Sequence, residues 1–256
     1  MDNNYKWYPA PRYLLRKQLL LKLLKQTNYK NKEILEIGYG SGDNLSTFAN
    51  LGMNVFGYDF SLSAYEEAKT RLAKQGLFPS KIKIFTEEQD AYSRHYDIVV
   101  ACEVLEHIKE DKSMLCKWNT LLRNDGFIIL SVPSRMKKWC DNDVWAGHYR
   151  RYEKEDLKNE LSDAGFVVNK FWSYPFPANF FLDPLLNMNK KQDISNYQTN
   201  NITKEDASKL SGVRRKTGFL ARKISNKWVL YPLHLLQLFF LNTDLGSGYI
   251  VLCKKQ

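Results

Sequence analysis

The sequence predicts an α/β protein built on a parallel, doubly wound sheet with helices on both faces. Strand-like and helix-like segments alternate from Glu33 to Tyr174 with short connections between them, which is the pattern of βαβ units. The first strand-like segment ends in a turn with three glycines, Gly38, Gly40 and Gly42. With 44% hydrophobic residues among 256, the chain is long and apolar enough for one large domain.

A basic amphipathic helix is expected ahead of the sheet, over residues 11–26. In PRYLLRKQLLLKLLKQ, leucines recur among lysines and arginines, and Pro11 stands at the start, where proline is favoured.

The strands that follow are expected in apolar runs, at residues 33–38, 54–61, 81–86, 96–102, 127–133 and 166–175. Helices are expected between them, at residues 43–52, 61–76, 111–126 and 153–165. In the helix of 61–76, Ser63 is the expected N-cap, since Glu66 follows three residues later.

The regular alternation stops at Pro175. Residues 175–247 hold two aromatic patches around a polar stretch rich in Lys, Asn and Ser, and GSGYIVLCKK then reads as one more strand. We therefore interpret 175–247 as an insertion before the last strand. It is too polar in its middle to hold a core of its own.

Positive charge is concentrated at the two ends of the chain. Residues 1–30 carry seven basic and one acidic side chain, and residues 187–256 carry twelve and four, whereas residues 31–186 carry nineteen and twenty-three. An anionic partner would meet these basic flanks, although a solvated basic surface explains them equally well.

The remaining composition favours a protein of the cytoplasm. The four cysteines form neither a C-x-x-C pair nor a metal-ligand spacing, so reduced thiols and no metal site are expected. We see no signal peptide. The apolar run at 229–241 is shorter than the roughly 20 residues that a membrane span needs.

The glycine turn decides which ligand is expected. Gly38, Gly40 and Gly42 form G-x-G-x-G, with Asp43 where a dinucleotide fingerprint has its last glycine, and no Gly-Lys-Ser/Thr follows as in a phosphate-binding loop. Glu36 lies inside the preceding strand. Its carboxylate would repel phosphates and suits a cationic ligand, for which S-adenosylmethionine is the prediction.

Asp59 supplies the second expected anchor, at the end of the strand 54–61. It follows Gly42 by 17 positions, close to the roughly 20-residue offset at which an acid reaches ribose hydroxyls in this topology. Such an acid also serves elsewhere as a simple helix cap. On consecutive strands, the turn and the acid together favour the ligand-binding interpretation.

From Glu33 to about Tyr174 the chain resembles the class I S-adenosylmethionine-dependent methyltransferases. The matching pieces, in that family's order, are ILEIGYGSG, VFGYDFS, YDIVVACEVLEHI, LLRNDGFIILSVPS and GHYRRYEKEDLKNELSDAGF. The resemblance implies a Rossmann-like sheet of seven strands, with the last one antiparallel beside the fifth. It also implies these cofactor-binding residues: Glu36, Gly38, Gly40, Gly42, Asp59, Phe60, Cys102 and Glu103. The family's adenine-contacting Asp has no clear match among Glu87, Glu88 and Asp90.

The CEVLEHI and GHYRRY pieces resemble the small-molecule branch, which includes quinone-pathway and surface-glycan-associated enzymes. The leading hypothesis is O-methylation of a small or glycan-like acceptor, phosphorylated or lipid-linked, in cell-surface polysaccharide biosynthesis. The alternative is a quinone or lipid-ring methyltransferase. Nucleic-acid methylation is disfavoured, because no Asn/Asp-Pro-Pro-Tyr element and no base-stacking pattern is present.

His148 is the expected catalytic base for an oxygen acceptor. It lies between the fifth strand and its helix, at the sheet edge where such folds bind ligands. Its alternative role is to seat the loop on the domain. The neighbouring substrate-binding candidates are Trp145, Tyr149, Arg150 and Arg151. An arginine fork suits a phosphate or carboxylate, and pairing with Glu153 or Glu155 is the competing interpretation.

Three regions are expected. Residues 1–31 form an N-terminal helical cap, 32–174 with 248–256 form the cofactor-binding domain, and 175–247 form a lid over the acceptor. The segment 228–241, with its neighbouring basic residues, suits either a lid helix packed on the sheet or peripheral contact with the inner face of an anionic membrane.

Overall fold

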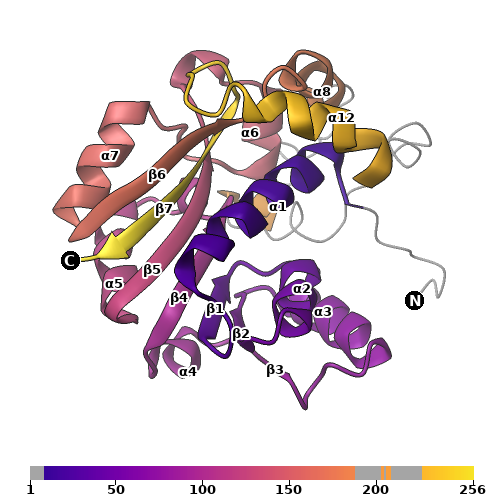
Figure 1. Cartoon of the computed structure of the whole chain (residues 1–256), viewed down its shortest axis with the longest axis vertical. Coiled ribbons are helices and arrows are strands. Elements are labelled where there is room, and N and C mark those ends of the chain that lie inside the picture. Colours follow the sequence, from indigo (N-terminus) through magenta and orange to yellow (C-terminus); the bar gives the residue numbers. More distant parts are fainter. Residues whose placement is uncertain (1–8, 188–202, 205, 209–226) are drawn as a thin grey trace.

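The computed structural model describes residues 9–187, 203–204, 206–208 and 227–256. Its seven strands form one sheet in the order β3-β2-β1-β4-β5-β7-β6. All neighbours are parallel except β7, which runs antiparallel between β5 and β6, as its arrow shows in Figure 1. The strands are β1 Glu33–Ile37, β2 Asn54–Tyr58, β3 Ile82–Phe85, β4 Tyr96–Cys102, β5 Leu122–Pro133, β6 Phe166–Tyr174 and β7 Gly248–Lys255. The predicted Rossmann-like sheet with an antiparallel last strand is confirmed.

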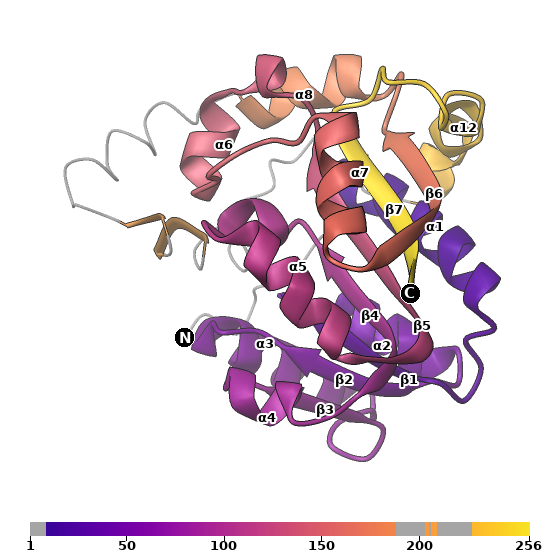
Figure 2. The ribbon, with the colours of Figure 1, turned by 90° about the vertical axis from the view of Figure 1, so that its left-hand side faces the viewer.

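Helices cover both faces of this sheet. They are α1 Pro11–Leu24, α2 Asp43–Asn50, α3 Leu62–Lys74, α4 Glu88–Tyr92, α5 Asp111–Thr120, α6 Asp141–Ala146, α7 Lys154–Asp163, α8 Asn179–Asn187 and α12 Lys227–Leu238. Figure 2 shows α5 and α7 in front of the strands. The helices α1, α2 and α3 pack on the opposite face.

Each face has its own apolar core. On one face Leu23 of α1, Phe48 of α2 and Leu72 of α3 are fully buried together. On the other face Trp118 of α5 and Leu161 of α7 pack against the strands. Because the central strands are buried on both sides, they read as continuous apolar runs in the sequence.

The structure differs from the sequence prediction in a few local features. The helix α3 is capped by Ser61, whose Oγ accepts from the amide of Ala64 at 3.4 Å, and not by Ser63. The strand β5 begins at Leu122, five residues before the predicted start. The short helices α4 and α6 were not predicted, because five and six residues are too few to show a helical repeat.

The N-terminal helix and the described parts of the insertion pack on one another. Leu15 of α1 contacts Ala178, Leu182 and Leu230 in a small apolar cluster beside α8 and α12. The basic runs at 214–216 and 222–223, expected to flank this surface, lie outside the described residues. The division into residues 1–31, 32–174 with 248–256, and 175–247 stays a prediction. Within the described residues, no helix is long and apolar enough to cross a membrane.

Candidate active site

The glycine turn leaves β1 at the carboxyl edge of the sheet. Gly38, Gly40 and Gly42 all have positive φ angles, of 71°, 51° and 73°, which glycine adopts without steric cost. A Cβ on Gly38 would lie 2.5 Å from Cγ2 of Val104. The turn therefore requires glycine for its backbone conformation, and at Gly38 also for space.

Glu36 places a carboxylate directly beneath this turn. It is buried, and its Oε1 accepts a hydrogen bond from Nδ2 of Asn44 at 2.7 Å. Its Oε2 is buried and has no hydrogen-bond partner in the described part of the chain. Burial raises the pKa of Glu36 to about 8. A carboxylate oxygen left in this state is suited to a cationic group that enters the site.

Asp59 follows β2 and is bound to the same turn. Its Oδ2 accepts from the amide of Gly40 at 2.9 Å, and its Oδ1 accepts from the amide of Ser61 at 3.0 Å. Burial raises the pKa of this carboxyl. Asp59 thus holds the glycine turn against α3, a role that the spacing did not reveal, and contact with a ribose remains a prediction. The next residue, Phe60, is about half exposed.

Cys102 and Glu103 end β4 at the same edge. Burial raises the pKa of the Cys102 thiol to about 11, so it stays protonated near neutral pH. Glu103, with a φ of 58°, accepts hydrogen bonds from Ser131 Oγ at 3.0 Å and Tyr174 OH at 2.9 Å. Glu103 is buried, which by itself would raise its pKa. The charges of Arg16 and Arg12 nevertheless lower the pKa of Glu103 to about 2. Glu103 is therefore an anion within the site.

The helix α1, predicted as part of an N-terminal cap, packs beside Glu103 and the start of α2. Lys17 donates to Asp43 at 2.5 Å and to Thr47 at 2.6 Å, and these bonds fix α1 to the start of α2. Arg16, one residue before, lies 3.3 Å from Glu103. Arginines within a leucine-rich amphipathic pattern look like solvated residues in sequence, so only the packing identifies Arg16 as part of the site.

His148 forms a buried pair with Asp143. Asp143 lies in α6, and His148 lies in the loop between α6 and α7. Its Nδ1 is 2.8 Å from Oδ1 of Asp143, and its side chain is 8% exposed. Hydrogen bonds from His148 and Arg151 hold the pKa of Asp143 well below its ordinary value, in spite of its burial. The anionic Asp143 favours a proton on Nδ1, which leaves Nε2 able to accept one.

Glu106 and His107 face the other side of the His148 ring. Oε1 of Glu106 is 3.9 Å from Nε2 of His148, and the His107 ring packs edge-on at 4.7 Å between centroids. Burial and the charge of Glu103 raise the pKa of Glu106. Glu106, His107 and His148 each offer a ligand atom, all within 4.8 Å of one another. This arrangement suits a divalent cation, whereas the cysteine spacing predicted no metal.

The predicted acceptor-binding residues surround His148, but both arginines already have carboxylate partners. Arg150 donates to Asp111 at 2.8 Å, and Arg151 donates to Asp143 at 2.7 Å. Neither of these partners is Glu153 or Glu155. The side chain of Trp145 is buried in α6. Nζ of Lys204 lies 4.2 Å from the centroid of the Tyr149 ring, so this residue packs against the loop.

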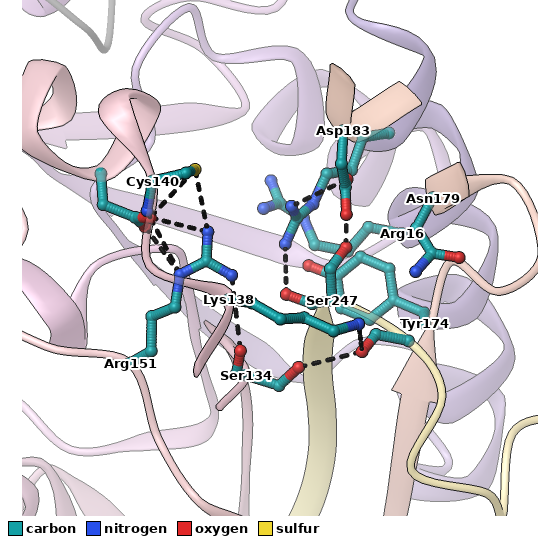
Figure 3. A network of polar contacts seen from close by, with 12 residues as sticks. Arg16, Ser134, Lys138, Cys140, Arg151, Tyr174, Asn179, Asp183 and Ser247 are labelled. Carbon is teal, nitrogen blue, oxygen red and sulfur yellow. Dashed lines mark hydrogen bonds and ion pairs between the residues drawn. The ribbon is translucent and has the colours of Figure 1, made fainter. Parts of the chain in front are cut away.

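A polar network joins these residues to the neighbouring elements. Figure 3 shows Arg151 between Cys140 and Ser134, with Lys138 extending across the loop that carries Ser247. Tyr174, Asn179 and Asp183 lie on the far side of this loop (Figure 3). The carboxyl edge therefore carries two adjoining groups of polar residues. One surrounds the glycine turn and the other surrounds His148.

Comparisons with known proteins agree with this arrangement. The family model described as a methyltransferase domain matches residues 10–170. The ubiquinone biosynthesis O-methyltransferase of Salmonella paratyphi A is 29% identical over 122 residues, which are 47% of this chain and 50% of that protein. The chain spans about half the length of the curated relatives it matches.

Solved structures share the fold at low sequence identity. The cyclase SpnF has a TM-score of 0.62 at 14% identity, covering 100% of this chain and 84% of SpnF. The magnesium protoporphyrin IX methyltransferase of Synechocystis PCC 6803, in complex with S-adenosylhomocysteine, has a TM-score of 0.57 at 14% identity over 96% of this chain and 86% of that chain. The family match covers well over half of the sequence. The chain belongs to the methyltransferase-domain family, within the class I S-adenosylmethionine-dependent methyltransferases.

Proposed function

We propose that this protein transfers a methyl group from S-adenosylmethionine to an oxygen of a small-molecule acceptor. The observation that carries the proposal is the unpartnered Oε2 of Glu36 beneath the glycine turn. It marks a place for the ammonium of the donor's amino-acid end, because a cation there stabilises the ionised form of Glu36, which a phosphate would destabilise.

The donor site fits the chemistry of this cofactor. Glu36 would bind the ammonium and Asp59 the ribose hydroxyls, while Arg16 stands where it can meet the donor's carboxylate. Phe60, Cys102 and Glu103 would line the rest of the crevice. When bound, S-adenosylmethionine supplies a methyl carbon already activated by its sulfonium. The protein's task is then to align the acceptor with it, which contributes about 7–11 kcal/mol to lowering the barrier.

His148 is proposed to take the proton of the acceptor hydroxyl. Its Nδ1 is fixed by Asp143 at 2.8 Å, so Nε2 is the atom that accepts the proton. Arg151 keeps Asp143 ionised by donating three hydrogen bonds at 2.7–3.0 Å. This residue would act through Asp143 and so be a positioning residue for His148.

The same cluster supports a second role for His148. Both carboxylate oxygens of the fully buried Glu106 have no hydrogen-bond partner in the described part of the chain. A divalent cation held by Glu106, His107 and His148 would satisfy them and would lower the pKa of a bound hydroxyl. The Asp143–His148 bond is the type of outer interaction that orients a histidine ligand. A chelator distinguishes this role from that of a base.

The comparisons favour a ring acceptor over a glycan. The curated relatives are ubiquinone biosynthesis O-methyltransferases, which supports the quinone-pathway alternative more than polysaccharide biosynthesis. An aromatic acceptor also suits the phenylalanines near this edge. The ring of Phe176 packs edge-on against Phe180 at 5.5 Å and against Phe240 at 4.8 Å.

Peripheral contact with a membrane is proposed for the surface of α8 and α12. Its apolar side chains are strongly exposed, with Phe180 at 67%, Phe181 at 71% and Phe239 at 82%. The opposite side of α12 packs on α1, since Leu230 and Gln237 are buried there. Exposed aromatic residues of this kind suit the boundary between headgroups and acyl chains. A lipid-borne ring acceptor would connect this surface with the site.

One experiment separates the parts of this proposal. The purified chain is titrated with S-adenosylhomocysteine by calorimetry, and tritium transfer from S-adenosylmethionine is measured on catechol-type ring acceptors, glycan precursors and RNA. We expect binding of the cofactor product and transfer to a ring hydroxyl. Cofactor binding with transfer only to RNA or to a glycan would overturn the acceptor assignment. Failure to bind S-adenosylhomocysteine would overturn the donor site.

A further inference from the structure

Three cationic side chains converge on the loop that leads into β7. Arg12 comes from α1, and Arg135 and Lys138 follow β5. Arg12 donates to the carbonyl of residue 247 at 3.0 Å, and Arg135 to that of residue 246 at 2.7 Å. Lys138 donates to the carbonyls of residues 245 and 246 at 3.1 and 2.8 Å. We call Arg12, Arg135 and Lys138 the cationic cluster.

The cationic cluster is only loosely matched by carboxylates. Arg12 lies 3.8 Å from Asp183 and 3.9 Å from Glu103, which it shares with Arg16. Arg135 lies 3.7 Å from Asp244. Within the described residues, no carboxylate lies within 4.0 Å of Nζ of Lys138. No member of the cationic cluster forms a hydrogen bond to a carboxylate there, so the cluster keeps a surplus of positive charge.

This surplus lies in a partly desolvated place. The side chains of Arg12 and Arg135 are 16% and 10% exposed, and Nε of Arg135 is buried with no hydrogen-bond partner among the described residues. Burial and the charges of Arg135, Arg12 and Arg151, opposed by Asp183, lower the pKa of Lys138 to about 8. Cations held together in low dielectric are stabilised by an anion.

The cationic cluster adjoins the proposed acceptor site. Ser134 joins the two, because its Oγ donates to the carbonyl of Gly246 at 3.1 Å while its own carbonyl accepts from Arg151 at 3.4 Å. Arg151 in turn binds Asp143, the partner of His148. Figure 3 shows this sequence of contacts, with Lys138 on one side of Ser134 and Arg151 on the other. Ser134 and Arg151 therefore place the cationic cluster next to the residues around His148.

We propose that the methyl acceptor carries a carboxylate or phosphate group, which Arg12 and Lys138 bind while the reacting hydroxyl lies at His148. This inference rests on the proposed function and specifies the chemistry of its acceptor. The anion contact was expected at Arg150 and Arg151, but these two residues already bind Asp111 and Asp143. The inference assigns that contact to Arg12 and Lys138 instead.

The test measures anion binding to the full chain saturated with S-adenosylhomocysteine. Inorganic phosphate and benzoate are the two probes. Their binding is measured by calorimetry or by the shifts that they cause in protein resonances. Lys138→Met removes the ammonium and keeps a long apolar side chain. Lys137→Met is the matched control, because Lys137 is the exposed neighbour. Lys138→Arg restores the charge.

We expect one of the two anions to bind the wild type, Lys137→Met and Lys138→Arg with the same affinity. The same anion should bind Lys138→Met about tenfold or more weakly. Binding of phosphate alone supports a phosphorylated acceptor, and binding of benzoate alone supports a carboxylated one. Absence of binding by both anions, or equal losses in Lys138→Met and Lys137→Met, would overturn the inference. Binding of S-adenosylhomocysteine, measured first on every variant, reports separately on the fold and on the donor site.

Discussion

Glu36 gives the sharpest prediction, because its buried carboxyl must change protonation when the donor binds. With a pKa of about 8 in the ligand-free protein, most Glu36 molecules carry a proton at pH 7. An ammonium beside Oε2 favours the ionised form. Binding at pH 7 should therefore release roughly one proton per S-adenosylhomocysteine bound.

The released proton is measured by calorimetry. Titrations in two buffers of different ionisation enthalpy, repeated between pH 6 and 7.5, give the number of protons from the difference in heat. The same linkage predicts that the dissociation constant falls by about tenfold for each unit by which the pH rises, as long as the pH stays well below the pKa of Glu36. Glu36→Gln keeps the shape and the hydrogen bond to Asn44 but cannot ionise, and its binding should be weaker and release no such proton.

The sign of the stability effect is also fixed by this pKa. Because the folded-state value lies above the ordinary 4.5, ionisation of Glu36 opposes folding, and stability is lost as the pH rises from about 4.5 through 8. Ligand-free Glu36→Gln should thus melt at a higher temperature than the wild type at pH 7. Equal proton release from wild type and Glu36→Gln, or a pH-independent dissociation constant in the wild type, would refute the role of this carboxylate.

Further predictions concern the turn, the base, the cation and the membrane. Gly38→Ala should destabilise the chain by about 1–3 kcal/mol, since its φ is positive and its Cβ would meet Val104, and urea unfolding measures this. His148→Gln should lower kcat by about 100-fold or more with unchanged binding of S-adenosylhomocysteine; unchanged turnover would remove His148 from the chemistry. If Glu106, His107 and His148 hold a cation, dialysis against a chelator should abolish turnover and Zn²⁺ should restore it. Full activity without metal leaves His148 as the base. Replacing Phe239 by Ser should reduce flotation with anionic liposomes, whereas the same change at the buried Leu230 should destabilise the protein instead; equal flotation of Phe239→Ser and wild type contradicts membrane contact.

Much of the fold followed from local pattern. Parallel strands buried on both faces show as apolar runs, and β1, β2 and β4 were each located by such a run and a turn signal. The apolar pattern located β7 as a strand. Its antiparallel direction and its place beside β5 came from the family resemblance, because an apolar run does not reveal the direction of a strand. The segments α4 and α6 are too short to show periodicity.

The candidate site was only partly visible in the sequence. Residues next to the glycine turn were found because the turn has a diagnostic spacing. Arg12 and Arg16 were missed, because their contacts with Glu103 and the loop before β7 join positions far apart in the chain. The Asp143–His148 pair was missed in part, since the spacing of five residues becomes a contact only through the turn at Gly147.

The central claim is that the turn after β1 holds the amino-acid end of the methyl donor. A crystal structure of the chain with S-adenosylhomocysteine tests this most directly. The account predicts the amino group of the ligand within hydrogen-bond distance of Oε2 of Glu36, and its ribose beside Asp59. A ligand bound elsewhere, or a pyrophosphate-containing cofactor bound in preference at this turn, would contradict the account.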